Sequence, residues 1–412
     1  MKRNRPDDGG KTPGTSLRGT GGGEASPRKD LFLSPLWGCN QRCLFCAKGR
    51  PPAGAAERMS AAEVINVLES RRREGCNHLF FDGGEPTLRK DLPALAAKAL
   101  ELGFEKVQVI TNGVALAGGK MVRELCAIPG SGRAISFSVS LHSHLPRVSD
   151  ALTRAPGTFA LTLAGLDAIK SSGLGFSIYH VITTSNFRAL PRFAAFAAEK
   201  FPRVNTVTFS HIFPSAGLPE GTLRCYPKIT AAAPYLVEAC VRLEAAGIRH
   251  RASDCGIVPM CLMRGSEQLF LKASAEAGKY LLTYDTGHTG PLQVFRKEFN
   301  DEFRAKGPRC GSCFVGRACL GMWKFYLEKF GCGELRPFSA AHFRGLARGG
   351  GTAALDLSSC LAGPDPAALA RIAVIDLRCR GFSRLKLKAA AVLGGDAAGL
   401  KAFARAAGFT LA

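Results

Sequence analysis

Short apolar runs alternate with amphipathic segments from residue 31 to residue 246 of the chain. The apolar runs have the length of strands, and the amphipathic segments repeat their apolar residues three and four positions apart, as helix faces do. The pattern predicts strands at 31–36, 78–81, 106–110, 134–141, 175–182 and 204–213, and helices at 61–73, 92–102, 121–127, 159–172, 190–200 and 230–246. This alternation predicts a parallel sheet, because each crossover helix returns the chain to the same end.

Six β–α units are fewer than the eight of a closed barrel. The sequence therefore predicts an α/β fold, a partial (β/α)6 TIM-type barrel over residues 29–246, with its site at the carboxyl ends of the strands. The pattern becomes irregular over 247–345. Residues 346–412 predict a small C-terminal element with one strand at 372–377 and one helix at 397–407.

The composition indicates a soluble protein with a sizeable core. The chain has 412 residues, of which 46% are hydrophobic, enough for two or three domains. No apolar run approaches the roughly 18–20 residues that span a bilayer. Residues 1–28 are basic and rich in glycine, with no signal-peptide core, and we expect a disordered tail there. We therefore expect a cytoplasmic protein with no membrane partner.

The formal net charge is +22. One interpretation is a nucleic-acid partner held through its phosphates. A second is attraction to a small acidic electron carrier. A third is compositional drift, because Arg, Ala and Gly are frequent throughout and no single basic block dominates.

Three of the 15 cysteines, Cys39, Cys43 and Cys46, follow the first predicted strand with the spacing C-x3-C-x2-C. Clusters of the [4Fe–4S] type ordinarily take four cysteine thiolates. A loop with only three leaves one iron open, much as a catalytic metal keeps an open coordination position. The spacing therefore predicts a reactive [4Fe–4S] cluster at the end of this strand.

With Gly83-Gly84-Glu85-Pro86 after the second strand, the pattern resembles the radical S-adenosylmethionine (SAM) superfamily over about residues 30–215. The resemblance implies that Cys39, Cys43 and Cys46 ligate the catalytic cluster and that SAM chelates its open iron. In this family the reduced cluster cleaves SAM to a 5′-deoxyadenosyl radical, which abstracts a hydrogen atom from the substrate. It also implies an electron donor of the flavodoxin or ferredoxin type.

The same resemblance assigns further residues to SAM. Phe45 matches the aromatic residue beside the adenine. Gly83, Gly84 and Glu85 match the segment that binds the SAM amino group, where glycine permits a close backbone approach. Candidates for the ribose or carboxylate stand at the ends of the third and fourth strands, where ordinary turn residues are the alternative; they are Asn112, Ser138 and Ser140.

A segment after the fourth strand, Ser140-Leu141-His142, is followed by Asp150, Thr153 and Pro156-Gly157-Thr158-Phe159. Similar segments occur in the branch of the family that carries auxiliary clusters. We expect His142 to face SAM or the substrate, with a purely structural role as the alternative. Tyr179 and His211, on the fifth and sixth strands, are candidates for the cavity wall, with core packing as an equal alternative.

A second cysteine group, Cys310, Cys313 and Cys319, has the spacing C-x2-C-x5-C. It resembles the twitch and SPASM extensions that bind auxiliary [4Fe–4S] clusters, and a zinc ribbon is the rival interpretation. We expect Cys261 as the fourth ligand, with Cys255 and Cys332 as alternatives. A full SPASM pattern continues to a cysteine where this chain has Trp323, which favours one auxiliary cluster rather than two.

Three functions remain as hypotheses. The first is a radical SAM enzyme that modifies a peptide, a protein or a small metabolite. The second is a radical SAM enzyme that modifies RNA or a nucleotide, which the basic charge would suit. The third is a non-catalytic iron–sulfur or zinc protein that binds nucleic acid, which the SAM-binding glycines disfavour.

Overall fold

The computed structural model describes residues 29–46, 57–212, 220–252, 258–264, 281–285, 292–295, 303–317, 319–346, 351–360 and 366–412. Two sequence predictions lie outside these residues, the disordered tail at 1–28 and the candidate ligand Cys255. Within the described residues, no helix combines the length and the hydropathy needed to cross a membrane.

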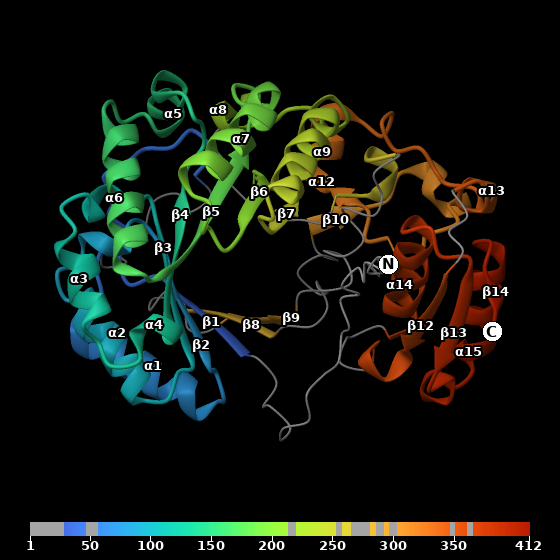
Figure 1. Ribbon diagram of the computed structural model, residues 1–412, viewed down its shortest axis with the longest axis horizontal. Helices are drawn as coiled ribbons and strands as arrows, with labels where there is room; N and C mark the ends of the chain where they lie inside the picture. The colour runs from blue at the N-terminus through green and yellow to red at the C-terminus, as the bar shows by residue number, and fades with distance from the viewer. Residues whose placement is uncertain are drawn as a thin grey trace, which may run out of the picture.

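Among the described residues, nine strands form one curved sheet in the order β7-β6-β5-β4-β3-β2-β1-β8-β9 (Figure 1). The seven strands of the barrel are β1 (Lys29–Leu33), β2 (His78–Phe81), β3 (Lys106–Thr111), β4 (Ile135–Ser140), β5 (Gly175–Ile182), β6 (Val207–His211) and β7 (His250–Ala252). Neighbouring barrel strands are parallel throughout. The predicted partial barrel is confirmed.

The sheet extends beyond the six predicted strands at both edges. β7 adds a seventh parallel strand next to β6. At the other edge, β8 (Leu281–Asp285) pairs in parallel with β1, and β9 (Leu292–Phe295) pairs antiparallel with β8. These strands come from the irregular region, where no β–α alternation announces them, so the sequence pattern missed them.

The predicted helices are present, and they cover the outer face of the sheet (Figure 1). They are α1 (Ala61–Arg73), α2 (Leu92–Glu101), α3 (Lys120–Cys126), α6 (Thr158–Ser172), α7 (Leu190–Lys200) and α9 (Ile229–Ala245). Shorter helices α4 (Ser131–Ala134), α5 (Pro146–Thr153) and α8 (Glu220–Arg224) lie in the connections.

The two faces of the barrel sheet differ in chemistry, as β4 shows. Ile135, Phe137 and Val139 are buried in the core shared with the helices. Because side chains alternate along a strand, Ser138 and Ser140 point to the opposite, inner face, where they are half-buried. The barrel therefore keeps its apolar packing outside and presents hydroxyl groups inside.

The region after the barrel is anchored to α9 through α12 (Lys324–Phe330). The Ile229 N–H at the start of α9 donates to the Tyr326 hydroxyl at 2.9 Å. That hydroxyl donates in turn to the Glu334 carboxylate, which also accepts from the backbone N–H of Thr230 at 3.3 Å. These contacts fix the second cysteine group to the barrel.

Residues 351–412 contain a small parallel βαβαβ unit. It consists of β12 (Thr352–Asp356), α14 (Pro366–Cys379), β13 (Arg384–Lys388), α15 (Asp396–Ala406) and β14 (Thr410–Leu411). The helix predicted at 397–407 is α15, but the strand predicted at 372–377 is wrong, since these residues lie within α14. The apolar run there is too short to separate strand from helix, and Ala370, Val374 and Arg378 are buried at helical spacing.

Candidate active site

The loop that carries the first cysteine group leaves β1 and returns to the start of α1, and its two ends are joined at the base. The Trp37 N–H donates to the Glu57 carbonyl at 2.9 Å, and the Met59 N–H donates to the Pro35 carbonyl at 3.1 Å. Leu36 and Arg58 form an antiparallel bridge between the same segments. The base of the loop is thus a short backbone ladder.

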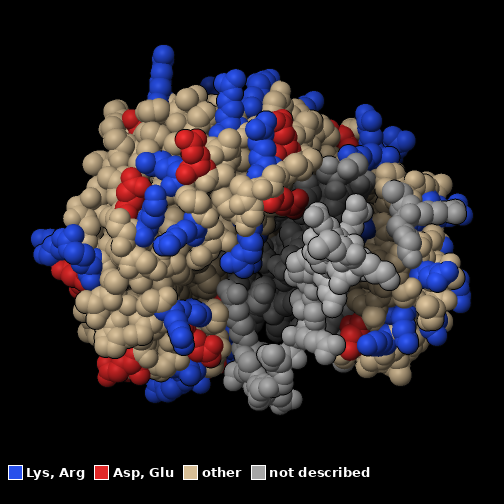
Figure 2. All heavy atoms as spheres, viewed as in Figure 1, with Lys and Arg blue, Asp and Glu red and all other residues tan. Residues whose placement is uncertain are grey.

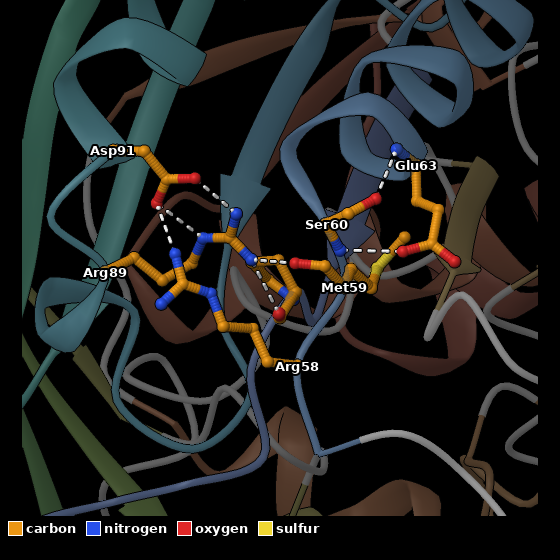
Figure 3. A network of polar contacts seen from close by, with 7 residues as sticks. Arg58, Met59, Ser60, Glu63, Arg89 and Asp91 are labelled. Atoms are coloured by element: carbon orange, nitrogen blue, oxygen red, sulfur yellow. Dashed lines mark hydrogen bonds and ion pairs between the residues drawn. The ribbon is translucent and has the colours of Figure 1, made fainter.

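Arg89 binds both segments of this ladder (Figure 3). Its side chain is 0% exposed, and its Nη1 donates to the Pro35 carbonyl at 3.0 Å and to the Met59 carbonyl at 2.6 Å. The other side of the guanidinium binds both carboxylate oxygens of Asp91, at 3.1 and 2.7 Å. Although burial acts in the opposite direction, Arg89 lowers the pKa of Asp91, so this carboxylate stays ionised beside the buried cation.

The far end of the cysteine loop rests on α5. The Arg42 N–H donates to the Thr153 carbonyl at 2.9 Å, and the Leu44 N–H donates to the Leu152 carbonyl at 3.0 Å. The Thr222 hydroxyl on α8 donates to the Leu44 carbonyl at 2.8 Å. Backbone groups that would otherwise be unpaired thereby fix the loop between two helices.

The segment from Asp150 to Phe159 completes this support. The Asp150 carboxylate accepts from the backbone N–H of Gly157 at 2.7 Å and of Phe159 at 2.8 Å, which orders the turn into α6. In that turn, the Thr158 hydroxyl accepts from the Gln41 amide at 3.2 Å. Residues 150–159, which follow the fourth strand, therefore support the cysteine loop.

The three thiols of the loop lie within electrostatic reach of one another. Burial raises the pKa of Cys43 to about 12, and the neighbouring Cys46 and Cys39 act in the same direction. Burial also raises the pKa of Cys39, although the Gln41 N–H, 3.4 Å from its sulfur, opposes this. Three thiolates gathered here need a positive counterpart, and the donor set fits a [4Fe–4S] cluster.

Two glycines let the loop and the end of β2 touch through backbone alone. Gly84 has no space for a side chain, because a Cβ there would lie 2.2 Å from the carbonyl oxygens of both Trp37 and Gly38. Gly83 has φ +111°, and its Cβ would lie 2.5 Å from the Leu36 oxygen. The N–H of Gly84 donates to that same oxygen at 2.7 Å. Only glycine fits this approach.

The Glu85 side chain faces the strands and lies fully buried. Its carboxylate accepts from the Thr87 N–H at 3.0 Å, the Thr111 hydroxyl at 2.6 Å and the Asn112 N–H at 2.7 Å. Burial raises the pKa of Glu85, and these hydrogen bonds oppose that rise. Glu85 thus joins the ends of β2 and β3, and its backbone N–H donates to Gly38 at 2.9 Å.

Asn112, at the end of β3, reaches the cysteine loop. Its amide nitrogen donates to the Asn40 side-chain oxygen at 2.6 Å and lies 3.8 Å from the Cys39 sulfur. The structure therefore brings together four of the predicted features: the cysteine loop, the two glycines, Glu85 and Asn112.

Phe45 and His142 also meet, with ring centroids 4.6 Å apart in an edge-on arrangement. The Val181 N–H donates to His142 Nδ1 at 3.1 Å. Burial lowers the pKa of His142 to about 3, so the ring is neutral near pH 7 and carries its proton on Nε2. His142 is thus oriented from behind and packs on the aromatic residue of the loop.

The other strand residues divide between the two faces. Ser140 pairs with Tyr179 and Ser138 with Ser177, so these side chains share the inner face. His211 belongs to the outer face, where it is buried and stacks on Tyr226 with ring centroids 6.0 Å apart. Of the two candidates for the cavity wall, Tyr179 and His211, only Tyr179 points inward.

The second cysteine group gathers around Cys261. Burial raises the pKa of Cys261 to about 11, and Cys319, Cys313 and Cys310 each act in the same direction. All four thiols therefore lie within electrostatic reach. The alternative Cys332 lies beside Gly307, with its sulfur 3.2 Å from where a Cβ of that glycine would be.

Backbone N–H groups point at three of these four sulfurs. Gly321 donates to Cys319 at 3.3 Å, and Phe338 donates to Cys313 at 3.4 Å. The Arg336 N–H donates to Cys261. Hydrogen bonds of this kind favour thiolates and tune the potentials of iron–sulfur clusters. In the part of the chain that the structure describes, no three His, Cys, Asp or Glu side chains converge as ligands of a single metal ion.

Sequence patterns missed several residues that build this site, namely Arg89, Asp91, Gln41 and Thr222. Nothing in the spacing of Arg89 and Asp91 indicates that the guanidinium is buried and paired with this carboxylate. Thr222 lies 178 positions from the residue it holds. Only the fold brings these partners together.

Comparisons with known proteins agree with this geometry. A model of the Radical SAM superfamily matches residues 33–197. A PqqA peptide cyclase of Xanthomonas campestris is 30% identical over 173 residues, 42% of this chain and 44% of the relative. An Fe-coproporphyrin III synthase of Methanosarcina barkeri is 29% identical over 167 residues, 40% of each protein. The chain thus matches about half or less of the length of these curated relatives.

Among solved structures, SuiB of Streptococcus suis bound to S-adenosylmethionine has a similar fold. The TM-score is 0.53 at 16% identity, over 74% of this chain and 75% of SuiB. SuiB bound to the precursor peptide SuiA gives a TM-score of 0.51 at 16% identity, over 74% of this chain and 73% of SuiB. At this identity the likeness shows the fold.

Proposed function

We propose that the protein is a radical SAM enzyme that cleaves SAM reductively and takes a hydrogen atom from a substrate, on the basis of the match of residues 33–197 to the model of the Radical SAM superfamily. Residues Cys39, Cys43 and Cys46 would hold a [4Fe–4S] cluster, which when reduced would supply the one electron that cleaves SAM to methionine and the 5′-deoxyadenosyl radical, and this radical would take the hydrogen atom. The observation that carries the proposal is the packing of the three-cysteine loop against Gly83 and Gly84 at the ends of parallel strands.

The residues of the chain would divide the work as follows. Cys39, Cys43 and Cys46 would hold three irons of the cluster. Phe45, held in place by His142, would contact the adenine, and the backbone at Gly83–Glu85 would bind the SAM amino group. Asn112, Ser138 and Ser140 would meet the ribose or the carboxylate, with Asn112 also ordering Asn40.

We propose an auxiliary [4Fe–4S] cluster on Cys261, Cys310, Cys313 and Cys319. The mutual electrostatic influence of the four thiols supports this ligand set, as do the three N–H groups directed at their sulfurs. An electron donor of the flavodoxin or ferredoxin type would reduce the enzyme.

A peptide or protein side chain is the substrate class we favour, with a small metabolite as the alternative. Two observations support it: the PqqA peptide cyclase among the relatives, and the precursor-peptide complex of the similar SuiB structure. The inner face of the barrel, with its hydroxyl groups on β4 and β5, offers donors and acceptors to a polar substrate.

The decisive experiment is anaerobic reconstitution followed by reduction with dithionite in the presence of SAM. We expect 5′-deoxyadenosine and about eight irons per chain, four for each cluster. Cys43→Ala should abolish 5′-deoxyadenosine formation, whereas Cys126→Ala, a half-buried thiol outside both groups, should leave it unchanged. A fully loaded protein that forms no 5′-deoxyadenosine would instead favour a non-catalytic iron–sulfur protein, and four irons with one zinc would favour the ribbon.

A second candidate is modification of RNA or a nucleotide, which the net charge of +22 favours. Figure 2 shows Lys and Arg side chains scattered over the described part of the visible face, with Asp and Glu between them. If RNA is the substrate, its affinity should fall steeply with salt concentration. Absence of RNA binding at low salt would leave the electron donor or compositional drift to explain the charge.

A further inference from the structure

A cavity of about 510 Å³ lies between the second cysteine group and the C-terminal unit, outside the residues that match the superfamily. One wall includes the loop residues Cys310 and Cys313, and the other comes from α14 and α15. Phe314 of the loop stacks on Phe403 of α15, with ring centroids 4.6 Å apart and planes within 8°. This stacking joins the two walls and gives the cavity an apolar side.

Three cationic side chains line the cavity beside the sulfurs of Cys310 and Cys313, which would be thiolates in the proposed cluster. Lys306, Arg317 and Arg371 line it, and no acidic side chain is among its described lining residues. Lys306 is held at the wall, where its ammonium donates to the Gly316 carbonyl at 2.7 Å. Like charges gathered around one cavity repel each other, and an anion between them relieves that repulsion.

Glycines open the backbone around the same cavity. Gly311, Gly316 and Gly399 all line it, so no side chain of theirs occupies the space. The Arg371 guanidinium lies over α15, with Nη2 3.9 Å from where a Cβ of Gly399 would be. Arg371 of α14 and Arg317 of the loop thus approach the cavity from its two walls.

We propose that this cavity binds a small molecule that carries a phosphate or diphosphate group. Three cations match an anion of more than one charge, and the guanidinium fork suits phosphate oxygens in bidentate fashion. The volume is that of a small-molecule site, and the Phe314–Phe403 pair provides an apolar surface for an organic part. The bound group would lie beside Cys310 and Cys313, so the C-terminal unit brings an anion to the auxiliary cysteines.

The test is calorimetric titration of the full-length reconstituted protein with pyrophosphate. A second titration with ADP distinguishes the free anion from a phosphate on an organic group, since tighter ADP binding would assign a role to the aromatic pair. We expect Arg371→Ala and Arg317→Ala each to weaken pyrophosphate binding about tenfold, the value of one charge-assisted contact. Arg371→Lys, which keeps the charge but loses the fork, should give an intermediate affinity.

The matched control is Lys401→Ala, which removes an exposed cation from α15 outside the cavity lining and should leave binding unchanged. The readout does not depend on SAM cleavage, so an inactive enzyme that binds pyrophosphate would still support the site. No binding by the unaltered protein would overturn the proposal. Equal loss of affinity in Lys401→Ala and Arg371→Ala would overturn it too, because general surface charge would then explain the binding.

Discussion

Two fully buried arginines, Arg89 in the barrel and Arg378 in the C-terminal unit, show how differently one side chain can be used in two regions. Arg89 binds two backbone carbonyls and the Asp91 carboxylate, and the carbonyls belong to the two ends of the cysteine loop. Arg378 donates to the carbonyls of Ala407 and Phe382, which lie in connections of its own unit, and to that of Leu346, which precedes the unit. The first arginine supports a site, and the second supports a fold.

The thiols of the two regions give the largest expected contrast. Cys43→Ala should abolish SAM cleavage, because it removes a proposed ligand of the first cluster, beside Gly83 and Gly84. Cys313→Ala should lower the iron content by about four atoms and leave 5′-deoxyadenosine formation in place, because the auxiliary cluster that we propose on Cys313 is separate from the first. Iron analysis and product quantification on the same samples check both. Loss of SAM cleavage in Cys313→Ala would show that the two regions are not independent.

Replacement of the barrel arginine should be the next largest effect. Arg89→Met leaves the Pro35 and Met59 carbonyls without their donor in a buried position, which costs about 2–4 kcal/mol of unfolding free energy. The open base of the loop should also lower iron incorporation at the first cluster. Urea unfolding and the electron paramagnetic resonance signal of the first cluster measure the two effects.

Arg378→Met is the matched variant, since it too removes a buried guanidinium from backbone carbonyls. It should destabilise the C-terminal unit by a similar amount and leave the first cluster fully loaded. If both variants lose the first cluster equally, general instability rather than support of the loop explains the result.

Acid should weaken the barrel. Burial lowers the pKa of His142 to about 3 and of His211 to about 4, from a usual value near 6.5. At pH values between the folded and the unfolded pKa, the unfolded chain binds more protons than the folded protein. The contribution of these histidines to stability is therefore complete above about pH 6.5 and falls as the pH drops toward 4. Burial raises the pKa of Glu85, so the folded protein binds a proton there more readily than the unfolded chain does. This carboxyl therefore favours the folded state as the pH falls, opposite to the two histidines.

The measurement is the urea midpoint at several pH values from 7.5 to 5. His142→Asn removes one of the groups and should flatten the dependence. A midpoint that stays constant over this range, or a slope that His142→Asn leaves unchanged, would contradict the assignment.

The smallest expected effect concerns the hydrogen bond between Thr158 and Gln41, which supports the cysteine loop. Thr158→Val removes the hydroxyl that accepts from the Gln41 amide and should cost about 1 kcal/mol. Ser171→Ala, which removes an exposed hydroxyl near the other end of α6, is the control. Thermal unfolding compares the two, and cluster loss on dilution should be faster for Thr158→Val alone.

The sequence predicted the barrel well because its information is local. Each strand and helix of the β–α units has its own periodicity, and the cysteine spacing lies within eight consecutive residues. The prediction of a strand at 372–377 is wrong because it, too, used only local information. A six-residue apolar run is equally compatible with part of a buried helix.

The parts that the sequence did not predict depend on distant contacts. Arg89 is 54 positions from Pro35 in the sequence. Its burial depends on the turn at residues 83–86, which brings it next to the base of the cysteine loop. The closeness of Cys261 to Cys319 joins two segments that no single pattern spans. His211 could not be assigned to a face from its sequence alone, because β6 is buried on both sides.

The distant supports of the cysteine loop also have a consequence for synthesis on the ribosome. Residues 39–46 emerge early, but Thr158, which holds Gln41, and Thr222, which holds Leu44, emerge 117 and 178 residues later. Until then the three thiols lie in a loop that lacks its hydrogen bonds to Thr158 and Thr222. Cluster insertion is therefore expected to follow translation of most of the barrel, which makes the nascent chain dependent on a cell that protects free thiols from oxygen during that interval.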